Sequence, residues 1–148
     1  MPATNPTPAD NRAQLMMNKM TLAPKQLFLV DGLGGMLSAL LLGVVLVRFE
    51  TAFGMPRKVL YFLSCLAGMY ALYSFLSYWR TKEKWRPYMQ AIAIANLLYC
   101  CLTIGLVIYH RQELTALGVT YFLLEVVVIT GLIIMELKTV SKFPGEKV

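Results

Sequence analysis

The chain has 148 residues, of which 57% are hydrophobic and only 15% are charged, and its mean hydropathy is +0.59. A soluble domain of this size has too much surface to hide such a proportion of apolar side chains. The net charge of +6 does not indicate nucleic-acid binding, because the basic residues fall in short segments between apolar runs. Composition therefore indicates a membrane protein and argues against nucleic acid as a partner.

The N-terminal segment, residues 1–26, contains several prolines and shows no apolar periodicity. A stretch of this kind cannot bury enough apolar surface to offset the entropy of ordering it. It also lacks the pattern of a cleaved signal peptide, since no small-residue cleavage site precedes a polar mature start. We therefore expect a mobile cytoplasmic tail here.

Four long apolar runs follow, each with about the 20 residues that a helix needs to cross the hydrocarbon core. Strands are excluded because polar and apolar residues do not alternate and an open sheet edge is not tolerated in lipid. The loops are short, so consecutive helices must run antiparallel. We predict an all-α polytopic membrane protein, an antiparallel four-helix transmembrane bundle over 27–137, followed by a cytoplasmic tail at 138–148. The predicted spans are residues 27–47, 59–79, 88–109 and 114–137.

The distribution of Lys and Arg predicts the orientation of the bundle. Ten of these residues lie in the N-terminal segment, in the loop at 80–86 and after residue 137, whereas four lie in the other two loops. Because cytoplasmic loops carry the excess of basic residues, we expect a multi-pass protein of the cell membrane with both termini in the cytoplasm.

Asp31 begins a stripe of small residues spaced four apart in the first run, which places them on one helix face. Small side chains let a neighbouring helix approach closely, so this face is expected to pack against protein, and the second run has a similar face. Asp31 is then either part of an ion or proton site or an interfacial acid near Lys25 or Lys138. The residues predicted to pack helices together are Gly35, Ala39, Gly43, Ser64, Gly68 and Ala71.

Glu125 is the acid that lies deepest in the predicted bilayer, about 16–18 Å from either end of the fourth run at the rise of an α-helix. The Leu, Ile, Val and Phe residues of this run contribute about −0.3 to −0.6 kcal/mol each and together outweigh a central acid at about +3 kcal/mol. The fourth run is therefore still predicted to cross the bilayer. The carboxyl group must be protonated, paired or beside water, because an isolated charge is costly in hydrocarbon.

Polar groups on the neighbouring runs could meet Glu125 and form a layer across the bundle. Asn96 and Tyr70 lie at similar depth, Tyr73 lies somewhat nearer the cytoplasm, and Asp31 lies in the first run. One interpretation is a proton or cation pathway, or a polar site for a small ligand. The other is a set of hydrogen bonds, from Asn96 or Tyr70 to Glu125, that hold the helices together at about 0.6–2 kcal/mol each.

No motif for catalysis, metal binding or cofactor binding is present. The three cysteines all lie in apolar runs without a CxxC spacing, and His110 is the only histidine. A P-loop, a GxSxG elbow and an HExxH helix are also absent. We therefore expect neither a metal nor a cofactor, and no enzymatic activity.

The sequence favours a structural or accessory membrane protein that contacts the lipid bilayer and packs through its small-residue faces, either as a homo-oligomer or against a larger membrane partner. The alternative is a small proton- or cation-coupled transporter with Glu125 as the protonatable group. These two hypotheses differ in whether the loss of the Glu125 carboxyl abolishes transport.

Overall fold

The computed structural model describes residues 7–20, 23–80 and 84–142; residues 1–6, 21–22 and 143–148 of the predicted tails lie outside these ranges. The described part of the chain is helical and contains no strand. Four helical segments in this described part are long and apolar enough to cross a membrane. The prediction of an all-α bundle of four antiparallel spans is confirmed, and the protein is a small polytopic membrane protein. In chain order the elements are α1 (Pro8–Met20), α2 (Pro24–Leu40), the π-helix η1 (Leu41–Leu46), α3 (Glu50–Phe53), α4 (Arg57–Arg80), α5 (Arg86–Tyr109) and α6 (Ala116–Lys142).

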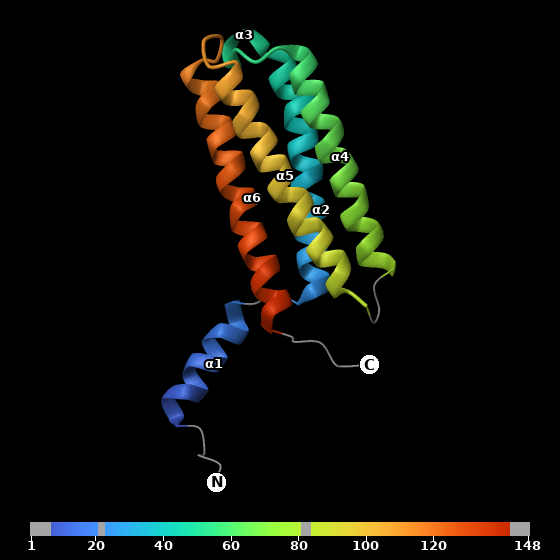
Figure 1. Ribbon diagram of the computed structural model, residues 1–148, viewed down its shortest axis with the longest axis vertical. Helices are drawn as coiled ribbons and strands as arrows, with labels where there is room; N and C mark the ends of the chain where they lie inside the picture. Colours follow the sequence, from blue (N-terminus) through green and yellow to red (C-terminus); the bar gives the residue numbers. More distant parts are fainter. Residues whose placement is uncertain (1–6, 21–22, 81–83, 143–148) are drawn as a thin grey trace.

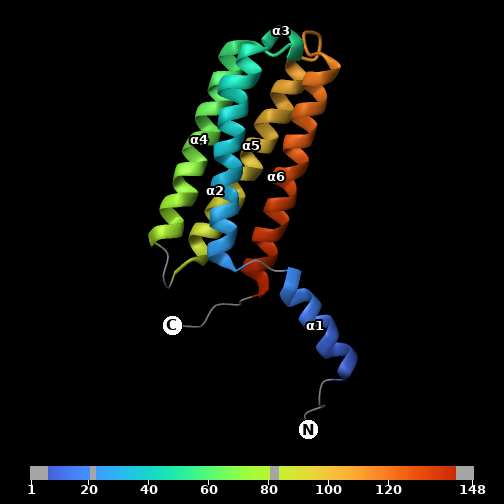
Figure 2. The ribbon, with the colours of Figure 1, turned by 180° about the vertical axis from the view of Figure 1, so that it is seen from behind.

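The bundle is built from two closely packed helix pairs. The first span, formed by α2 and η1, lies along α4, and α5 lies along α6 (Figure 1). Seen from behind, α2 stands between α4 and α6, with α5 on the far side (Figure 2). Contacts between the two pairs are sparse, and this leaves room for a cavity in the middle of the bundle.

The first span is not a uniform α-helix, because it widens into one π-helical turn at Leu41–Leu46. Directly before this turn, the Ser64 hydroxyl of α4 donates a 2.7 Å hydrogen bond to the carbonyl oxygen of Ala39. A side chain that enters the backbone hydrogen-bond ladder is a recognised cause of such irregularities. Ser64 can come this close because Gly43 has no side chain, and a Cβ there would lie 2.5 Å from the serine oxygen.

The short helix α3 closes the end of the bundle opposite to the start of α2. It ends at Gly54, whose φ of 76° is left-handed and favours glycine. Thr115, directly before α6, fastens this turn through two hydrogen bonds, from its amide to the Phe53 carbonyl at 3.2 Å and from its hydroxyl to the Ala52 carbonyl at 2.5 Å. The loop after the first span is thereby attached to the start of the fourth.

The N-terminal segment contains a helix, α1, which the sequence analysis did not predict. Thr7 and Asp10 cap each other: the Asp10 amide donates to the Thr7 hydroxyl at 3.4 Å, and the Thr7 amide donates to the Asp10 carboxylate at 3.3 Å. Pro8 lies at the first helical position, where its missing N–H costs nothing. Pro8 therefore begins a helix rather than preventing one. Figure 1 shows α1 outside the bundle.

Helix α6 continues five residues beyond the predicted end of the fourth span, to Lys142. Val140 is buried in this extension, and it packs with Leu27 and Phe28 at the start of the first span and with Met89 of α5. These contacts extend the helix into the segment that was assigned to the C-terminal tail. Glu125 is consequently closer to the start of α6 than to its end.

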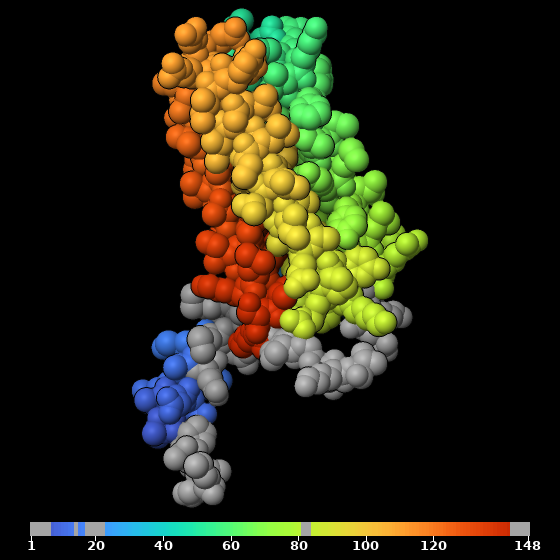
Figure 3. Space-filling view, in the orientation of Figure 1, coloured from blue at the N-terminus to red at the C-terminus, as the bar shows by residue number. Residues whose placement is uncertain are grey.

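Two apolar clusters occupy the two ends of the bundle, and buried polar residues lie between them. The cluster near α3 includes Leu46, Leu60 and Phe122, and the other contains the four residues just named with Ile92. Large apolar side chains are also exposed around the outside of all four spans. Figure 3 shows the face on which α5 lies between α6 and α4. Such a surface suits contact with lipid.

Candidate functional site

A cluster of four buried polar side chains takes one member from each span. Asp31 comes from α2, Ser74 from α4, Asn96 from α5 and Glu136 from α6, and none is more than 7% exposed. We call these residues the four-helix cluster. It lies about one helix turn from the apolar cluster that contains Leu27, Phe28 and Val140.

Asp31 is the centre of the hydrogen bonding in this cluster. The Ser74 hydroxyl donates to its Oδ2 at 2.5 Å, and the Asn96 amide donates to its Oδ1 at 2.8 Å. Both carboxyl oxygens therefore accept a hydrogen bond from a neighbouring helix. Neither Lys25 nor Lys138 is its partner in the described structure; both lysines are exposed.

The sequence analysis did not single out Glu136 as a site residue. It is 1% exposed, and its carboxyl group lies beside Asp31 and the Asn96 side chain. Its Oε2 atom is buried without a hydrogen-bond partner among the described residues. The signal that could have identified it is helix periodicity, since Glu136 follows Glu125 by eleven residues, about three helix turns, and so lies on the same helix face.

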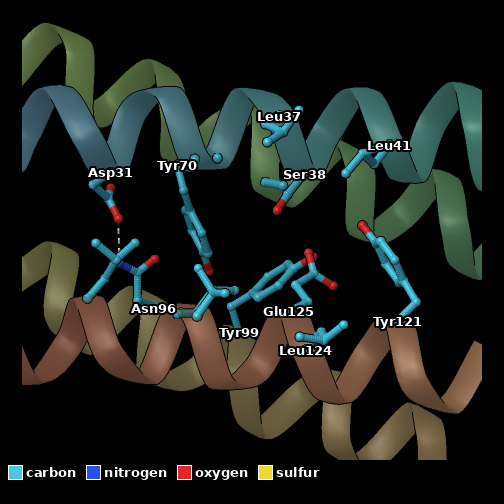
Figure 4. A pocket seen from close by; sticks show the side chains of 16 residues that line it. Asp31, Leu37, Ser38, Leu41, Tyr70, Asn96, Tyr99, Tyr121, Leu124 and Glu125 are labelled. Atoms are coloured by element: carbon cyan, nitrogen blue, oxygen red, sulfur yellow. Dashed lines mark hydrogen bonds between the residues drawn. The ribbon is translucent and has the colours of Figure 1, made fainter.

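Glu125 lies at a second level, farther along the bundle. The Tyr99 hydroxyl donates a 3.3 Å hydrogen bond to its Oε1, and Ser38 of α2 faces the same carboxyl group (Figure 4). Glu125 is 8% exposed, and its Oε2 is buried without a partner among the residues described. The carboxyl is therefore only partly satisfied.

The partner of Glu125 is not the one that the sequence analysis expected. Asn96 bonds to Asp31 rather than to Glu125, and Tyr70 contributes a ring contact instead of a hydrogen bond to the acid. Tyr99 was missed, although it follows Asn96 by three residues and so shares its helix face.

A cavity of about 290 Å³ connects these two levels between the helix pairs. Asp31 and Asn96 contribute to its lining at one end, and Ser38, Tyr121 and Glu125 at the other (Figure 4). Most of the remaining lining is aliphatic, and no Lys, Arg or His of the described chain contributes to it. The cavity thus offers two carboxyl groups in apolar surroundings.

The two predicted tyrosines are placed differently. Tyr70 lines the cavity, and its ring meets that of Tyr99 edge-on at a centroid distance of 6.1 Å. Tyr73 is 39% exposed and does not contribute to the cavity lining. Of the five residues proposed for a polar layer, the structure gathers Asp31, Tyr70, Asn96 and Glu125 around one cavity and leaves Tyr73 outside.

The small residues of α2 and α4 lie against each other. A Cβ on Gly35 would come within 3.1 Å of the Ala71 Cβ and 3.2 Å of the Ala67 carbonyl oxygen. Gly68 is less crowded, since its added Cβ would first meet the Ala39 Cβ at 3.9 Å. The stripe on α2 therefore contributes to the close approach of two helices within this chain.

Cysteine and histidine contribute little to these sites. Cys100 is buried, while Cys65 and Cys101 are exposed. Within the described ranges no three His, Cys, Asp or Glu side chains come together as a set of metal ligands. The chemistry that the cavity offers is that of carboxyl, amide and hydroxyl oxygens, which bind protons and cations.

Comparisons with protein-family models, curated proteins and solved structures find no match for this chain.

Proposed function

We propose that this four-span protein is a small transporter that carries a proton or a cation across the bilayer, with Glu125 as the protonatable group. The observation that carries the proposal is the partly satisfied carboxyl group of Glu125 on the wall of an intramembrane cavity. Buried polar atoms in proteins usually have a hydrogen-bond partner, whereas Oε2 of this carboxyl group has none among the described residues. Ionisable side chains within membrane spans face cavities and pathways in transport proteins.

The position of Asp31 supports the same proposal. Asp31 and Glu125 line opposite ends of one cavity, so a proton or cation that leaves one carboxyl has a second within the same space. The aliphatic side chains between them limit the water that surrounds a bound charge. Two acidic stations in a low-dielectric passage are suited to stepwise transfer of positive charge.

The cavity also points to assembly of more than one copy. Leu37 of α2 and Leu124 and Val128 of α6 line it and are exposed on the outside of the bundle. A single chain therefore leaves the cavity partly open towards lipid. A second copy packed against α2 and α6 would close it, and this supports a homo-oligomer as the transporting unit.

The proposal is tested by measuring ion flux in proteoliposomes that contain the full chain. Glu125→Gln keeps the size of the side chain and removes the ionisable group, so we expect flux to fall to the level of empty liposomes. Glu113→Gln is the matched control, because Glu113 is exposed in the loop before α6. Equal flux in wild type and Glu125→Gln would refute the proposed role of the carboxyl.

A second candidate function, an accessory role beside a larger membrane protein, is favoured by a groove on the outside of the α2–α4 pair. Gly43, Ser64 and Gly68 contribute to its lining, and small residues of this kind accept a neighbouring transmembrane helix. Gly68→Leu tests this function better than a change at Gly35, which would disturb the bundle itself. We expect the leucine to abolish co-purification of a partner while the chain stays folded. Unchanged co-purification would exclude the groove as the surface that binds the partner.

The location and orientation of the bundle belong to the same proposal. The start of α2, the end of α6 and the facing ends of α4 and α5 lie at one end of the molecule (Figure 1). We propose that this basic end faces the cytoplasm of the cell membrane. Reporter fusions after residue 148 and within the loop at 110–113 should give opposite locations, with the C-terminal fusion cytoplasmic.

A further inference from the structure

The oxygen atoms of the four-helix cluster are not all used in hydrogen bonds. Asp31 accepts from Ser74 and from the amide NH₂ of Asn96, which leaves the amide oxygen of Asn96 and the lone pairs of the Ser74 hydroxyl available as acceptors. Glu136 adds Oε2, which is buried and has no partner in the described structure. The cluster therefore has more acceptors than donors.

The charges of the cluster are also unbalanced. Asp31 and Glu136 lie close enough for their carboxyl groups to interact electrostatically. No Lys or Arg in the described ranges forms an ion pair with either acid. Arg86 of α5 donates from Nη2 to the carbonyl oxygen of Val140 at 3.2 Å, and its Nε is buried without a partner among the described residues. Two neighbouring carboxyl groups in hydrocarbon, without a basic partner, favour the binding of a positive ion.

We propose that Asp31, Ser74, Asn96 and Glu136 form a binding site for one Na⁺ ion. The buried, unpartnered oxygen of Glu136 is the observation that points to a ligand, since an acidic pair whose oxygens were all satisfied would need none. Each of the four spans supplies one oxygen-bearing side chain, so the ion would hold all four helices at one level. Asp31 and Asn96 line the cavity, which gives the ion a way into the cluster.

The number and type of ligands favour a monovalent ion over a divalent one. Ca²⁺ takes about 6–8 oxygen ligands, and Mg²⁺ requires octahedral geometry and keeps several of its waters. The cluster offers two carboxyl groups, one amide and one hydroxyl, and no third acidic side chain joins them in the described part of the chain. It also lacks the sulfur and nitrogen ligands that transition metals prefer.

This inference deepens the proposed transport function, because Na⁺ would then be the coupling ion. Binding at the four-helix cluster can nevertheless be measured without any flux. If Na⁺ binds and Glu125→Gln transports normally, only the role of Glu125 fails. If Glu125→Gln abolishes flux and Na⁺ does not bind, only the sodium site fails.

The test compares the thermal unfolding of the full chain in detergent, in NaCl and in choline chloride at equal ionic strength and pH. A ligand that binds only the folded state raises the melting temperature, so we expect a rise of a few degrees in NaCl. Glu136→Gln should abolish the response, and the exposed Glu113→Gln should keep it. An equal rise in KCl, an equal rise in Glu136→Gln, or a response to pH without any response to Na⁺ would overturn the proposal.

Loss of the response through misfolding is distinguished in two ways. Glu136→Gln replaces a buried acid by a neutral side chain of the same size, so in choline it should melt no lower than wild type. Ser74→Ala removes one ligand oxygen without a change of charge and should shift the half-saturating Na⁺ concentration upwards several-fold. A Ser74→Ala protein with wild-type Na⁺ affinity would remove Ser74 from the site and contradict a site that spans all four helices.

Discussion

The hydroxyl of Tyr99 donates a 3.3 Å hydrogen bond to Oε1 of Glu125, and this contact joins α5 to α6 on the wall of the cavity. Tyr99 is 3% exposed, and its ring meets that of Tyr70 from α4. Three helices are therefore linked through one tyrosine. Because Oε2 of Glu125 has no partner in the described chain, the carboxyl group is fixed in position while one of its oxygens remains available.

Replacing Tyr99 by Phe should weaken the bundle by about 1 kcal/mol, since hydrogen bonds between transmembrane helices contribute roughly 0.6–1.7 kcal/mol. The ring and its contact with Tyr70 are kept, so the change reports on the hydroxyl alone. Unfolding by SDS in mixed micelles, followed by circular dichroism, measures the difference. Tyr61→Phe is the control, because Tyr61 is 55% exposed; equal stability of the two variants would contradict a structural role for the hydrogen bond.

Gly35→Ala should destabilise the α2–α4 pair, whereas Gly131→Ala should not. The added methyl group on Gly35 would lie 3.1 Å from the Ala71 Cβ, while at Gly131 nothing lies within 4 Å. Overpacking costs about 1–3 kcal/mol, and a glycine replaced by alanine in an open helical position gains up to about 1 kcal/mol. In the same SDS titration, the midpoint of unfolding should therefore shift to less SDS for Gly35→Ala and to more SDS for Gly131→Ala. A stabilising Gly35→Ala would show that the two helices separate easily.

Gly54→Ala should destabilise the loop that attaches α3 to the start of α6. An L-residue at a φ of 76° costs about 1–2 kcal/mol, and its Cβ would also collide with the backbone carbonyl of Glu113. We expect the free energy of unfolding to fall by at least that amount, and proteolysis between α3 and α4 to become faster. Gly105→Ala is the control, because nothing lies within 4 Å of an added Cβ there. Wild-type proteolysis in Gly54→Ala would contradict the tight contact with Glu113.

The two tryptophans should report the position of the bilayer interface. Trp79 is 79% exposed near the end of α4, and Trp85 directly precedes α5, so both flank the same connection. Tryptophan is enriched at the boundary between lipid and water. Lipids brominated near the headgroup should therefore quench the fluorescence more strongly than lipids brominated near the end of the chain. The reverse order would mean that the spans are placed too deep or too shallow.

The four spans could be predicted from the sequence because each apolar run is long and its loops are short, and lipid permits no other backbone structure. The ends and irregularities of the helices were harder to predict from the sequence. Helix α1 depends on the mutual cap of Thr7 and Asp10, which a search for apolar periodicity does not detect. The extension of α6 depends on the burial of Val140 by residues of other helices, and the π-helical turn depends on a hydroxyl from α4.

The candidate site could be predicted from the sequence only in part, for a related reason. The rarity of acids in apolar runs identified Asp31 and Glu125, and helix periodicity placed Asn96 on an inward face. The pairing of these residues could not be read from depth alone, because a shift of one helix turn exchanges the partners. Asn96 meets Asp31 rather than Glu125, and Tyr99 takes the place that Asn96 was expected to fill.

The four-helix cluster has a consequence for how the chain finds its final arrangement in the bilayer. Burial of aliphatic side chains is non-directional, so on its own it distinguishes poorly between neighbouring depths and rotations of a helix. A vertical shift or a rotation of any one span would separate its cluster member from the other three and leave polar atoms unsolvated in hydrocarbon. The cluster therefore favours one relative depth and one rotation for all four helices, among many arrangements that would bury a similar apolar area.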